Sequence, residues 1–252
     1  MLFKDCPEEY PITLYVNGRE LLTIQLTEVN LEDWATGFLF AEGIIGSAQE
    51  IRQIGIDPYR GNIFTEVETT ACDIDQFLKR KRIITAGCGR GVTFRSLKEV
   101  GQFKKVVSTV KIPLTYIREK MKTFAKMTPL YQKTGGMHAA AIIKPDGELI
   151  VREDIGRHNA VDKTIGAALR KGLNGSDLIM LTTGRISFEM CSKIAKFGIG
   201  VAASRTAATN LAVALAKDLS IDLIGYCRGK SAVIYTSGSH IIKESREASG
   251  TS

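Results

Sequence analysis

Alternating apolar and polar residues open the chain. Residues 11–16 and 21–26 each follow the two-residue period of a half-buried strand, and Asn17-Gly18 between them is typical of a hairpin turn. Apolar residues then recur at helical spacing over 31–45, after Asn30, a residue suited to cap a helix. Two further strands and a short helix are predicted at 50–56, 63–68 and 73–81. This part of the sequence predicts an α+β unit.

Helical and strand-like patterns alternate through the second half of the chain. A helix is expected over 113–127, because Pro113 suits a first helical turn, and Pro145-Asp146-Gly147 predicts a hairpin between strands at 139–144 and 148–152. The remaining strands are predicted at 178–182, 199–203, 221–226 and 232–236, and the remaining helices at 158–171, 186–197 and 207–218. Such alternation predicts a mostly parallel sheet with helices on both faces.

These patterns predict an α/β protein with two domains. Residues 1–108 are expected to form a smaller N-terminal α+β domain. Residues 109–252 are expected to form a C-terminal three-layer α/β/α domain, in which a sheet is covered by helices on both sides.

The composition is that of an ordinary globular protein with excess positive charge. The 252 residues carry 34 Lys and Arg against 27 Asp and Glu, a net charge of +7. Such a balance suits a nucleic acid, a phosphate-rich small ligand or an acidic partner protein. Aromatic residues do not interleave with the basic ones, so we predict no nucleic-acid partner. No apolar run approaches the ~20 residues of a membrane span, and residues 1–10 lack the apolar core of a signal peptide. We expect a cytoplasmic protein without a membrane partner.

A glycine-rich stretch around Cys88 is the first candidate for chemistry. Gly87, Gly89 and Gly91 alternate with Cys88 and Arg90. The glycines leave the backbone unrestricted, and a nearby guanidinium favours the reactive thiolate. A tight turn that happens to contain a cysteine explains the same pattern. The five cysteines of the chain are scattered and form no Cys-x-x-Cys pair, so neither a zinc ribbon nor a thioredoxin-type site is predicted.

Two predicted strand-to-helix junctions share a composition that suits phosphate. The first contains Gly184, Arg185 and Ser187, and the second contains Arg205. In open α/β sheets, ligands bind beyond the carboxyl ends of the strands, where helix amides and a guanidinium favour an anion. Ordinary helix capping explains the hydroxyl groups at these junctions but not both arginines.

His158 and Asp162 lie four residues apart on a predicted helix and therefore share one face. This spacing allows Asp162 to orient His158 as a base for Cys88, as in a cysteine hydrolase. The alternative is helix capping and a surface pair. His138, which follows two glycines, is a candidate to line the same cavity. Zinc-deaminase chemistry is disfavoured, because the His-x-Glu and Pro-Cys-x-x-Cys motifs are missing.

Residues 225–231 end a predicted strand with an aromatic ring and two cations. Tyr226 is suited to hold a heterocycle, while Arg228 and Lys230 are suited to reach phosphates. A plain turn between the last two strands explains the same residues.

Four segments together resemble a known family, the formate dehydrogenase accessory sulfurtransferases (FdhD). They are Thr134-Gly-Gly-Met-His138, Glu153-Asp-Ile-Gly-Arg-His-Asn-Ala-Val-Asp-Lys163, Thr183-Gly-Arg185 and Gly225 to Lys230. The similarity covers most of the chain and is densest from Gly135 to Tyr235. The eleven-residue block from Glu153 to Lys163 is long and specific.

The resemblance implies a function in sulfur transfer. Members of this family accept sulfur as a cysteine persulfide from a cysteine desulfurase and pass it to the bis-molybdopterin guanine dinucleotide cofactor of formate dehydrogenase, which carries molybdenum or tungsten. The resemblance also implies a homodimer and a C-terminal domain similar to the cytidine deaminase fold without its zinc. The persulfide cysteine aligns with Cys88.

The resemblance further implies where the cofactor, bound as a substrate through its GDP-like guanine nucleotides, is held. The family's cofactor-binding segment aligns with Tyr226, Cys227, Arg228, Gly229, Lys230 and Ser231. The arginine junctions, with Gly184, Arg185, Ser187 and Arg205, suit its pyrophosphates, and we add His158 to this set. No metal ligands are predicted.

The chain departs from the family at one position. Family members commonly carry Cys-Gly-x-Cys-Gly in the reactive loop, whereas this chain has Gly91 at the second cysteine position. Either Cys88 carries sulfur alone, or the chain binds the cofactor as a chaperone without transferring sulfur. A cysteine hydrolase using Cys88 and His158 is the third hypothesis.

Overall fold

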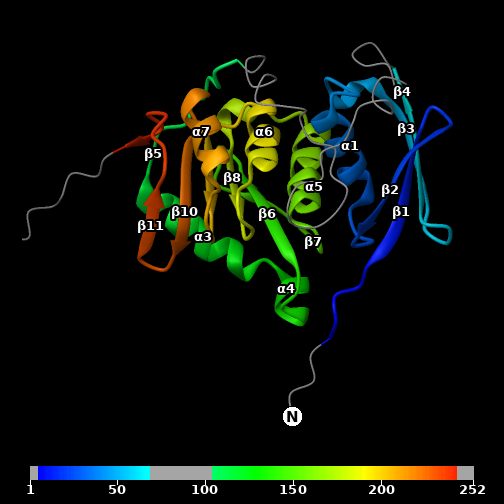
Figure 1. The fold of residues 1–252 in the computed structure, drawn as a ribbon, viewed down its shortest axis with the longest axis horizontal. Helices are drawn as coiled ribbons and strands as arrows, with labels where there is room; N and C mark the ends of the chain where they lie inside the picture. The colour runs from blue at the N-terminus through cyan, green and yellow to red at the C-terminus, as the bar shows by residue number, and fades with distance from the viewer. Residues whose placement is uncertain (1–4, 69–103, 243–252) are drawn as a thin grey trace, which may run out of the picture.

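Two β-sheets with helices packed between and around them organise the chain (Figure 1). The computed structural model describes residues 5–68 and 104–242. The first sheet has the strand order β2-β1-β4-β3, in which β1 and β4 run parallel and the other pairs antiparallel. Its strands are β1 (Tyr10–Val16), β2 (Arg19–Leu26), β3 (Ile51–Asp57) and β4 (Asn62–Val67). The predicted helix at 73–81 and the Cys88 stretch lie outside the described residues.

The local signals in this first sheet act as predicted, with one exception. Asn17 and Gly18 have φ values of 49° and 75°, so the β1–β2 hairpin turns through two left-handed residues. Helix α1 (Leu31–Glu42) begins where expected, but the capping role of Asn30 was wrong. Asn30 takes a left-handed conformation and its side chain makes no capping hydrogen bond. The helix stops before the predicted residue 45 because Gly43, at φ 77°, turns the backbone away.

The second sheet has six strands in the order β11-β10-β9-β8-β6-β7. They are β6 (His138–Ile143), β7 (Leu149–Asp154), β8 (Ile179–Thr182), β9 (Val201–Ser204), β10 (Asp222–Arg228) and β11 (Ser231–Ile234). Only the β8–β9 and β9–β10 pairs are parallel among these strands. The prediction of a mostly parallel sheet was therefore wrong. Two hairpins, β6–β7 and β10–β11, bring antiparallel strands to both edges, because a short turn can join only antiparallel neighbours.

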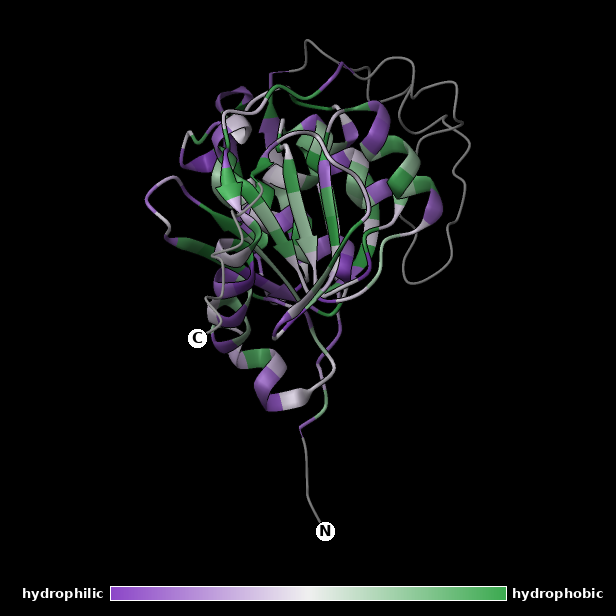
Figure 2. Cartoon of the chain, turned by 90° about the vertical axis from the view of Figure 1, so that its left-hand side faces the viewer, coloured by the Kyte–Doolittle hydropathy of each residue, from purple (hydrophilic) through white to green (hydrophobic). Residues whose placement is uncertain are grey.

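Helices cover both faces of this sheet, which confirms the predicted three-layer α/β/α arrangement. One face packs against α5 (Arg157–Arg170), α6 (Phe188–Lys196) and α7 (Asn210–Asp218), and the other against α3 (Leu114–Lys126). Successive β6 residues alternate between the two cores: Ala140 and Ile142 face α5, whereas Ala139 and Ala141 face α3. Figure 2 shows the apolar strands enclosed between helices whose outer faces are polar. The likeness to the cytidine deaminase fold stays a prediction.

Several short elements were not predicted from the sequence. A helix of six residues, α4 (Pro129–Thr134), precedes β6. The two-residue strands β5 (Ile112–Pro113) and β12 (Ile241–Ile242) pair with each other. Two 3₁₀ turns complete the described elements, η1 (Ala48–Glu50) and η3 (Gly175–Asp177).

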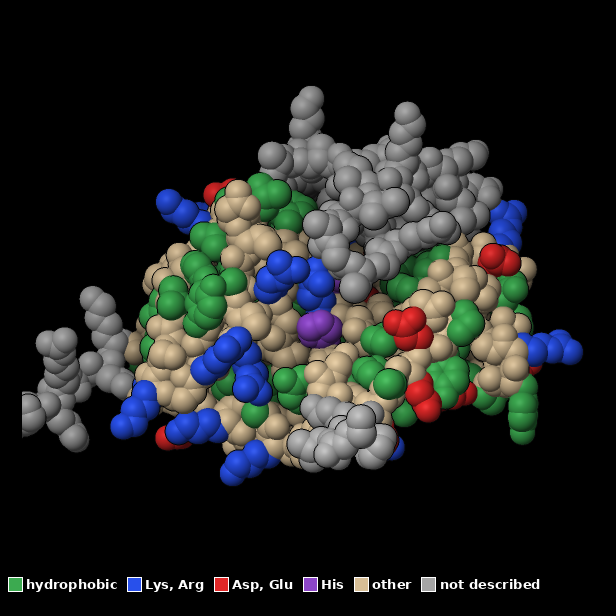
Figure 3. All heavy atoms as spheres, turned by 60° about the horizontal axis from the view of Figure 1, so that its bottom comes forward, with side chains coloured by type: hydrophobic (Ala, Val, Ile, Leu, Met, Phe, Trp, Pro, Cys, Tyr) green, Lys and Arg blue, Asp and Glu red, His purple; other side chains and the backbone are tan. Residues whose placement is uncertain are grey.

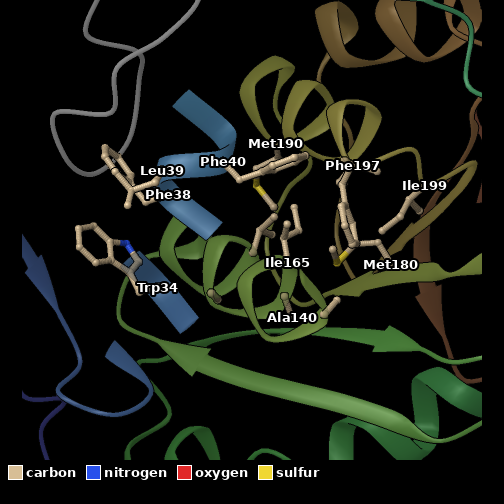
Figure 4. Packing of buried hydrophobic residues seen from close by; sticks show 14 of the residues in the cluster. Trp34, Phe38, Leu39, Phe40, Ala140, Ile165, Met180, Met190, Phe197 and Ile199 are labelled. Carbon is tan, nitrogen blue, oxygen red and sulfur yellow. The ribbon is translucent and has the colours of Figure 1, made fainter. Parts of the chain in front are cut away.

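Helix α1 packs closely on α5 and joins the two sheets through one core (Figure 4). A Cβ atom on Gly37 would lie 1.9 Å from the carbonyl oxygen of Asp162, and one on Gly166 would lie 1.8 Å from that of Asp33. No side chain fits at either position. Trp34 and Leu39, which point away from α5, are completely buried as well. The division into domains at residue 108 stays a prediction, and α1 shares its core with the C-terminal half.

Two further observations complete the fold. Cys191 is buried in α6, and burial raises the pKa of its thiol to about 12. Within residues 5–68 and 104–242, no helix is both long and apolar enough to cross a lipid bilayer.

Candidate functional site

The carboxyl ends of β8, β9 and β10 bring together most of the described residues that the sequence singled out. The segments after β8 and β9 are tied to each other, since Ile186 donates its amide to Ala207 O at 3.1 Å and accepts from Thr209 N at 3.0 Å. Ser187 caps α6 and Thr209 caps α7 through their side-chain oxygens. The capping explanation for these hydroxyls is therefore confirmed, and the question that remains is what the arginines do.

His158 and Ser187, both predicted site residues, meet at this edge. His158 is the second residue of α5, and its Nε2 lies 3.2 Å from Ser187 Oγ and 3.0 Å from Glu189 Oε2. Gly184 leaves space for Arg157 and His138, because a Cβ atom at residue 184 would lie 2.9 Å from Arg157 Cβ and 3.3 Å from His138 Nδ1. We call His138, Arg157, His158, Ser187 and Glu189 the histidine cluster.

His138 is neutral at pH 7. Burial lowers the pKa of His138 below its ordinary 6.5, and the positive charge of Arg157 lowers the pKa further. A neutral imidazole offers one donor and one acceptor, whereas an imidazolium offers two donors. His138 can therefore accept a hydrogen bond as well as donate one.

The arrangement predicted for a cysteine hydrolase is not what the structure contains. Both carboxylate oxygens of Asp162 accept hydrogen bonds from Lys193 Nζ, at 2.7 and 2.5 Å, so Asp162 does not orient His158. Ser187 and Glu189 also contact the same nitrogen, Nε2. A catalytic triad needs the hydroxyl and the carboxylate on opposite ring nitrogens. The structure therefore does not support the His158–Asp162 pair on which the hydrolase hypothesis depends.

Most of the Glu153–Lys163 block has a structural role. Asp154 and Lys163 form a completely buried ion pair of 2.7 Å, and Lys163 also donates to Thr27 O at 2.8 Å. Asp154 further accepts from Thr27 N and from Asn159 Nδ2. Glu153 accepts from two backbone amides at the start of α4. This network ties β7, α5 and the segment after β2 together and holds the start of α5, and with it His158, at the carboxyl edge.

The β10–β11 hairpin presents the predicted cofactor-binding segment. Tyr226 has φ 48°, an uncommon conformation for an aromatic residue, and the pairing with β11 shifts register between Gly225 and Arg228. At this bulge Tyr226 is 47% exposed. Gly229 and Lys230 form the exposed turn, which Ser231 closes by donating its hydroxyl to Arg228 O at 3.0 Å. The plain-turn explanation accounts for Ser231 but not for the bulge.

Four cations surround a small pocket between this hairpin and α3. Arg118 and Lys122 come from α3, Arg205 follows β9, and Arg228 ends β10. The remaining lining residues, Met121, Ala125, Cys227 and Gly229, are uncharged, and the pocket measures about 100 Å³. We call this site the basic pocket. Figure 3 shows Lys and Arg side chains gathered on this face of the molecule near a histidine.

Hydrogen bonds to the backbone hold two of these arginines in place. Arg228 Nε donates to Arg205 O at 2.5 Å, and Arg118 Nε donates to Gly229 O at 3.3 Å. Cys227 is buried beneath them, and its burial raises the pKa of the thiol. A neutral Cys227 leaves the positive charge of the pocket undiminished.

The predicted site residues thus separate into two groups. Gly184, Ser187 and His158 belong with the histidine cluster, whereas Arg205, Cys227, Arg228 and Gly229 belong with the basic pocket. Arg185 is exposed and does not line the basic pocket, but its positive charge is among those that lower the pKa of His138 in the histidine cluster. Cys88 lies outside the described residues.

Sequence reasoning missed three residues of this edge. Glu189 lies two residues after Ser187, and the motif Arg185-Ile-Ser-Phe-Glu189 contained the only available signal. Arg118 and Lys122 lie on the helix predicted at 113–127, for which the sequence indicated no site residues. Their one-turn spacing was visible, but nothing in the sequence placed α3 beside the hairpin.

Within residues 5–68 and 104–242, no group of three His, Cys, Asp or Glu side chains is arranged to hold a metal ion.

Comparison with protein families finds one that spans almost the whole chain. The FdhD/NarQ family matches residues 7–242. A protein of Geobacillus kaustophilus named sulfur carrier protein FdhD is 36% identical over 234 residues, which are 93% of this chain and 89% of the relative. A Bacillus subtilis protein of the same name is also 36% identical, over 228 residues that cover 90% of this chain and 87% of the relative.

Comparison with solved structures agrees with this match. The chain resembles the crystal structure of a protein from Desulfotalea psychrophila named a formate dehydrogenase accessory protein. The TM-score is 0.76 at 28% sequence identity, and the alignment covers 94% of this chain and 90% of the other. The fold described above is therefore shared with that protein over nearly its full length.

Proposed function

The chain belongs to the FdhD/NarQ family, and from this membership we propose that it accepts sulfur from a cysteine desulfurase on Cys88 and delivers it to the molybdenum bis-molybdopterin guanine dinucleotide cofactor of formate dehydrogenase. The cofactor is the substrate of this reaction. The relatives named sulfur carrier protein support the transfer of sulfur. We propose further that the chain acts as a homodimer.

The observation that carries the substrate assignment is the basic pocket next to the exposed Tyr226. Guanine dinucleotides bring a flat heterocycle and a pyrophosphate. Arg205 and Arg228 supply guanidinium donors for the phosphates, and Tyr226 is 47% exposed on the adjoining bulge. Charge-assisted hydrogen bonds to phosphate are about twice as strong as neutral ones. The two guanidinium groups and the exposed ring therefore support the choice of a guanine nucleotide.

The sulfur step is a thiol–disulfide type of exchange. The Cys88 thiolate attacks the outer sulfur of the desulfurase persulfide, a sulfur–sulfur bond forms at Cys88, and the donor cysteine leaves as a thiolate. This first exchange requires no oxidant or reductant. Release of the carried sulfur as sulfide regenerates the Cys88 thiol and requires two electrons, for which we assign a thiol reductant.

Mass spectrometry after incubation with a cysteine desulfurase and cysteine tests the carrier role. The expected product is one sulfur adduct on the peptide that contains Cys88. Cys88→Ala should abolish both this adduct and the maturation of formate dehydrogenase. Cys6→Ala is the matched control, because Cys6 is exposed and lies outside the glycine-rich stretch. Full maturation by the Cys88→Ala variant would overturn sulfur transfer through this residue.

Binding of guanosine diphosphate tests the substrate assignment. Arg228→Ala should weaken binding by about tenfold or more, because one charge-assisted contact to phosphate is lost. The double variant with Arg185→Ala measures whether the exposed Arg185 contributes as well. Binding that survives the double replacement would place the nucleotide elsewhere.

A chaperone without sulfur transfer is the second candidate, and Gly91 favours it. Since Gly91 replaces the second cysteine of the family's loop, no two-cysteine relay exists within this stretch. In that case Cys88→Ala would keep both cofactor binding and maturation. The same two assays therefore separate the carrier from the chaperone.

A further inference from the structure

Helix α3 contributes half of the positive charge around the basic pocket. Arg118 and Lys122 are four residues apart and therefore lie on one face of α3. The adjoining face of the same helix carries Ile117, Met121 and Phe124 into the core against the sheet, and Met121 also lines the pocket. None of the sequence motifs includes α3.

The arrangement of donors suits a tetrahedral oxyanion. The Nε atoms of Arg118 and Arg228 are already bonded to backbone carbonyls, which fixes the planes of the two guanidinium groups. A guanidinium carries five N–H donors, so each arginine keeps donors for a ligand. The ammonium of Lys122 adds three more donors on a flexible stem.

The size of the pocket sets the kind of group that enters. Sites that enclose a drug-sized ligand measure roughly 300–1,000 Å³. At about 100 Å³, the basic pocket accepts one small group rather than a whole nucleoside. No Asp or Glu is among the lining residues, so an anion meets only cations and neutral groups there. The neutral Cys227 thiol forms part of the lining.

We propose that α3 and the β10–β11 hairpin together form a phosphate-binding pocket, in which Arg118 and Lys122 hold a phosphate group from the side opposite Arg205 and Arg228. The ligand class is a molecule with a phosphate or pyrophosphate group. The proposal rests on the proposed function only for the identity of the molecule that carries this group.

Isothermal titration calorimetry with inorganic pyrophosphate at low ionic strength tests the pocket. The unmodified chain should bind with saturation, and Arg118→Ala and Lys122→Ala should each weaken binding by about tenfold. Lys126→Ala is the matched control, because Lys126 lies one turn beyond Lys122 on α3 but does not line the pocket. Binding should also weaken as salt is added, since the cations are partly solvent-exposed. Equal binding by Lys122→Ala and the unmodified chain would overturn the proposal.

Arg118→Ala also removes the hydrogen bond from Arg118 Nε to Gly229 O in the hairpin, so a second variant changes charge alone. Lys122→Glu reverses one exposed charge and should abolish measurable pyrophosphate binding while the melting temperature stays unchanged. An equal loss of binding in Lys126→Glu would show a general charge effect and would also overturn the pocket.

The pyrophosphate titration can fail or succeed independently of the sulfur-transfer assay, because binding of inorganic pyrophosphate involves no sulfur. Pyrophosphate binding that depends on Arg118 and Lys122 supports the pocket even in a chain that takes no sulfur on Cys88. Conversely, a chain that matures formate dehydrogenase but binds pyrophosphate equally with and without Lys122 keeps its function and loses the pocket.

Discussion

The histidine cluster and the basic pocket lie at the ends of neighbouring strands, yet they use positive charge in opposite ways. Below the cluster two cations form ion pairs with buried carboxylates, Lys193 with Asp162 and Lys163 with Asp154. Within it, His158 Nε2 lies 3.0 Å from Glu189 Oε2. The four cations of the basic pocket share a lining without any acidic residue. Paired charges fix the shape of one region, and gathered charges give the other its affinity for an anion.

The largest effect should follow from breaking a buried pair. Lys163→Met leaves the carboxylate of Asp154 buried without its cation and should lower the free energy of unfolding by about 3–5 kcal/mol. Denaturant unfolding measures this loss. Adding Asp154→Asn should recover part of it, since the uncompensated charge is then removed. A loss below about 1 kcal/mol would contradict the role assigned to the pair.

A smaller effect is expected from filling the space beside Gly184. Gly184→Ala brings a methyl group to 2.9 Å from Arg157 Cβ, so the cluster must shift, at a cost of about 1–3 kcal/mol. Thermal unfolding measures the cost. Gly55→Ala in β3 is the control, because a Cβ there meets nothing within 4 Å. Equal melting temperatures for the two variants would show that the histidine cluster is not closely packed.

One part of the pH dependence of stability should come from His138 in the histidine cluster. Since burial lowers the pKa of His138 in the folded chain, the unfolded chain binds its proton more readily. The contribution of neutral His138 to the free energy of unfolding is therefore complete above pH 6.5. It falls as the pH drops through the pKa that His138 has in the folded chain, which is lower than 6.5. NMR titration of the ring should show a pKa below 6.5. His138→Gln should remove this part of the acid sensitivity, and an unchanged profile would contradict it.

The smallest effect on stability is expected at the hairpin turn. Lys230 is exposed, so Lys230→Ala should change the free energy of unfolding by no more than about 0.5 kcal/mol. The same variant should weaken binding of guanosine diphosphate if the turn reaches the phosphates. Calorimetry on one preparation gives both values. A large loss of stability would place Lys230 among the paired charges instead.

Local signals in the sequence predicted most elements, because they depend on neighbouring residues. Asn17-Gly18 fixed the first hairpin, and the apolar spacing predicted α3, α5, α6 and α7 within a few residues. Strand direction was not predictable in the same way, since it depends on which strands become neighbours. The sheet is mixed because β6 inserts between β7 and β8.

The site was predictable where residues are close in sequence and not where the fold brings them together. Arg228, Lys230 and the junction residues stood within short motifs. Glu189 and the α3 pair acquire their roles through long-range contacts with His158 and with the hairpin. The spacing of His158 and Asp162 was misleading for the same reason: Lys193, from the next helix, takes the carboxylate.

The close crossing of α1 and α5 has a consequence for how the chain folds during synthesis. Gly37 and Gly166 face each other's helix, so α1 gains its packing partner only ~130 residues after it leaves the ribosome. At about 5–20 residues per second, this delay is on the order of ten seconds. Throughout that interval the face of α1 that carries Gly37 and Phe40 has no α5 to cover it. Chaperone dependence of the nascent chain should therefore end when α5 emerges, well before synthesis of the sheet is complete.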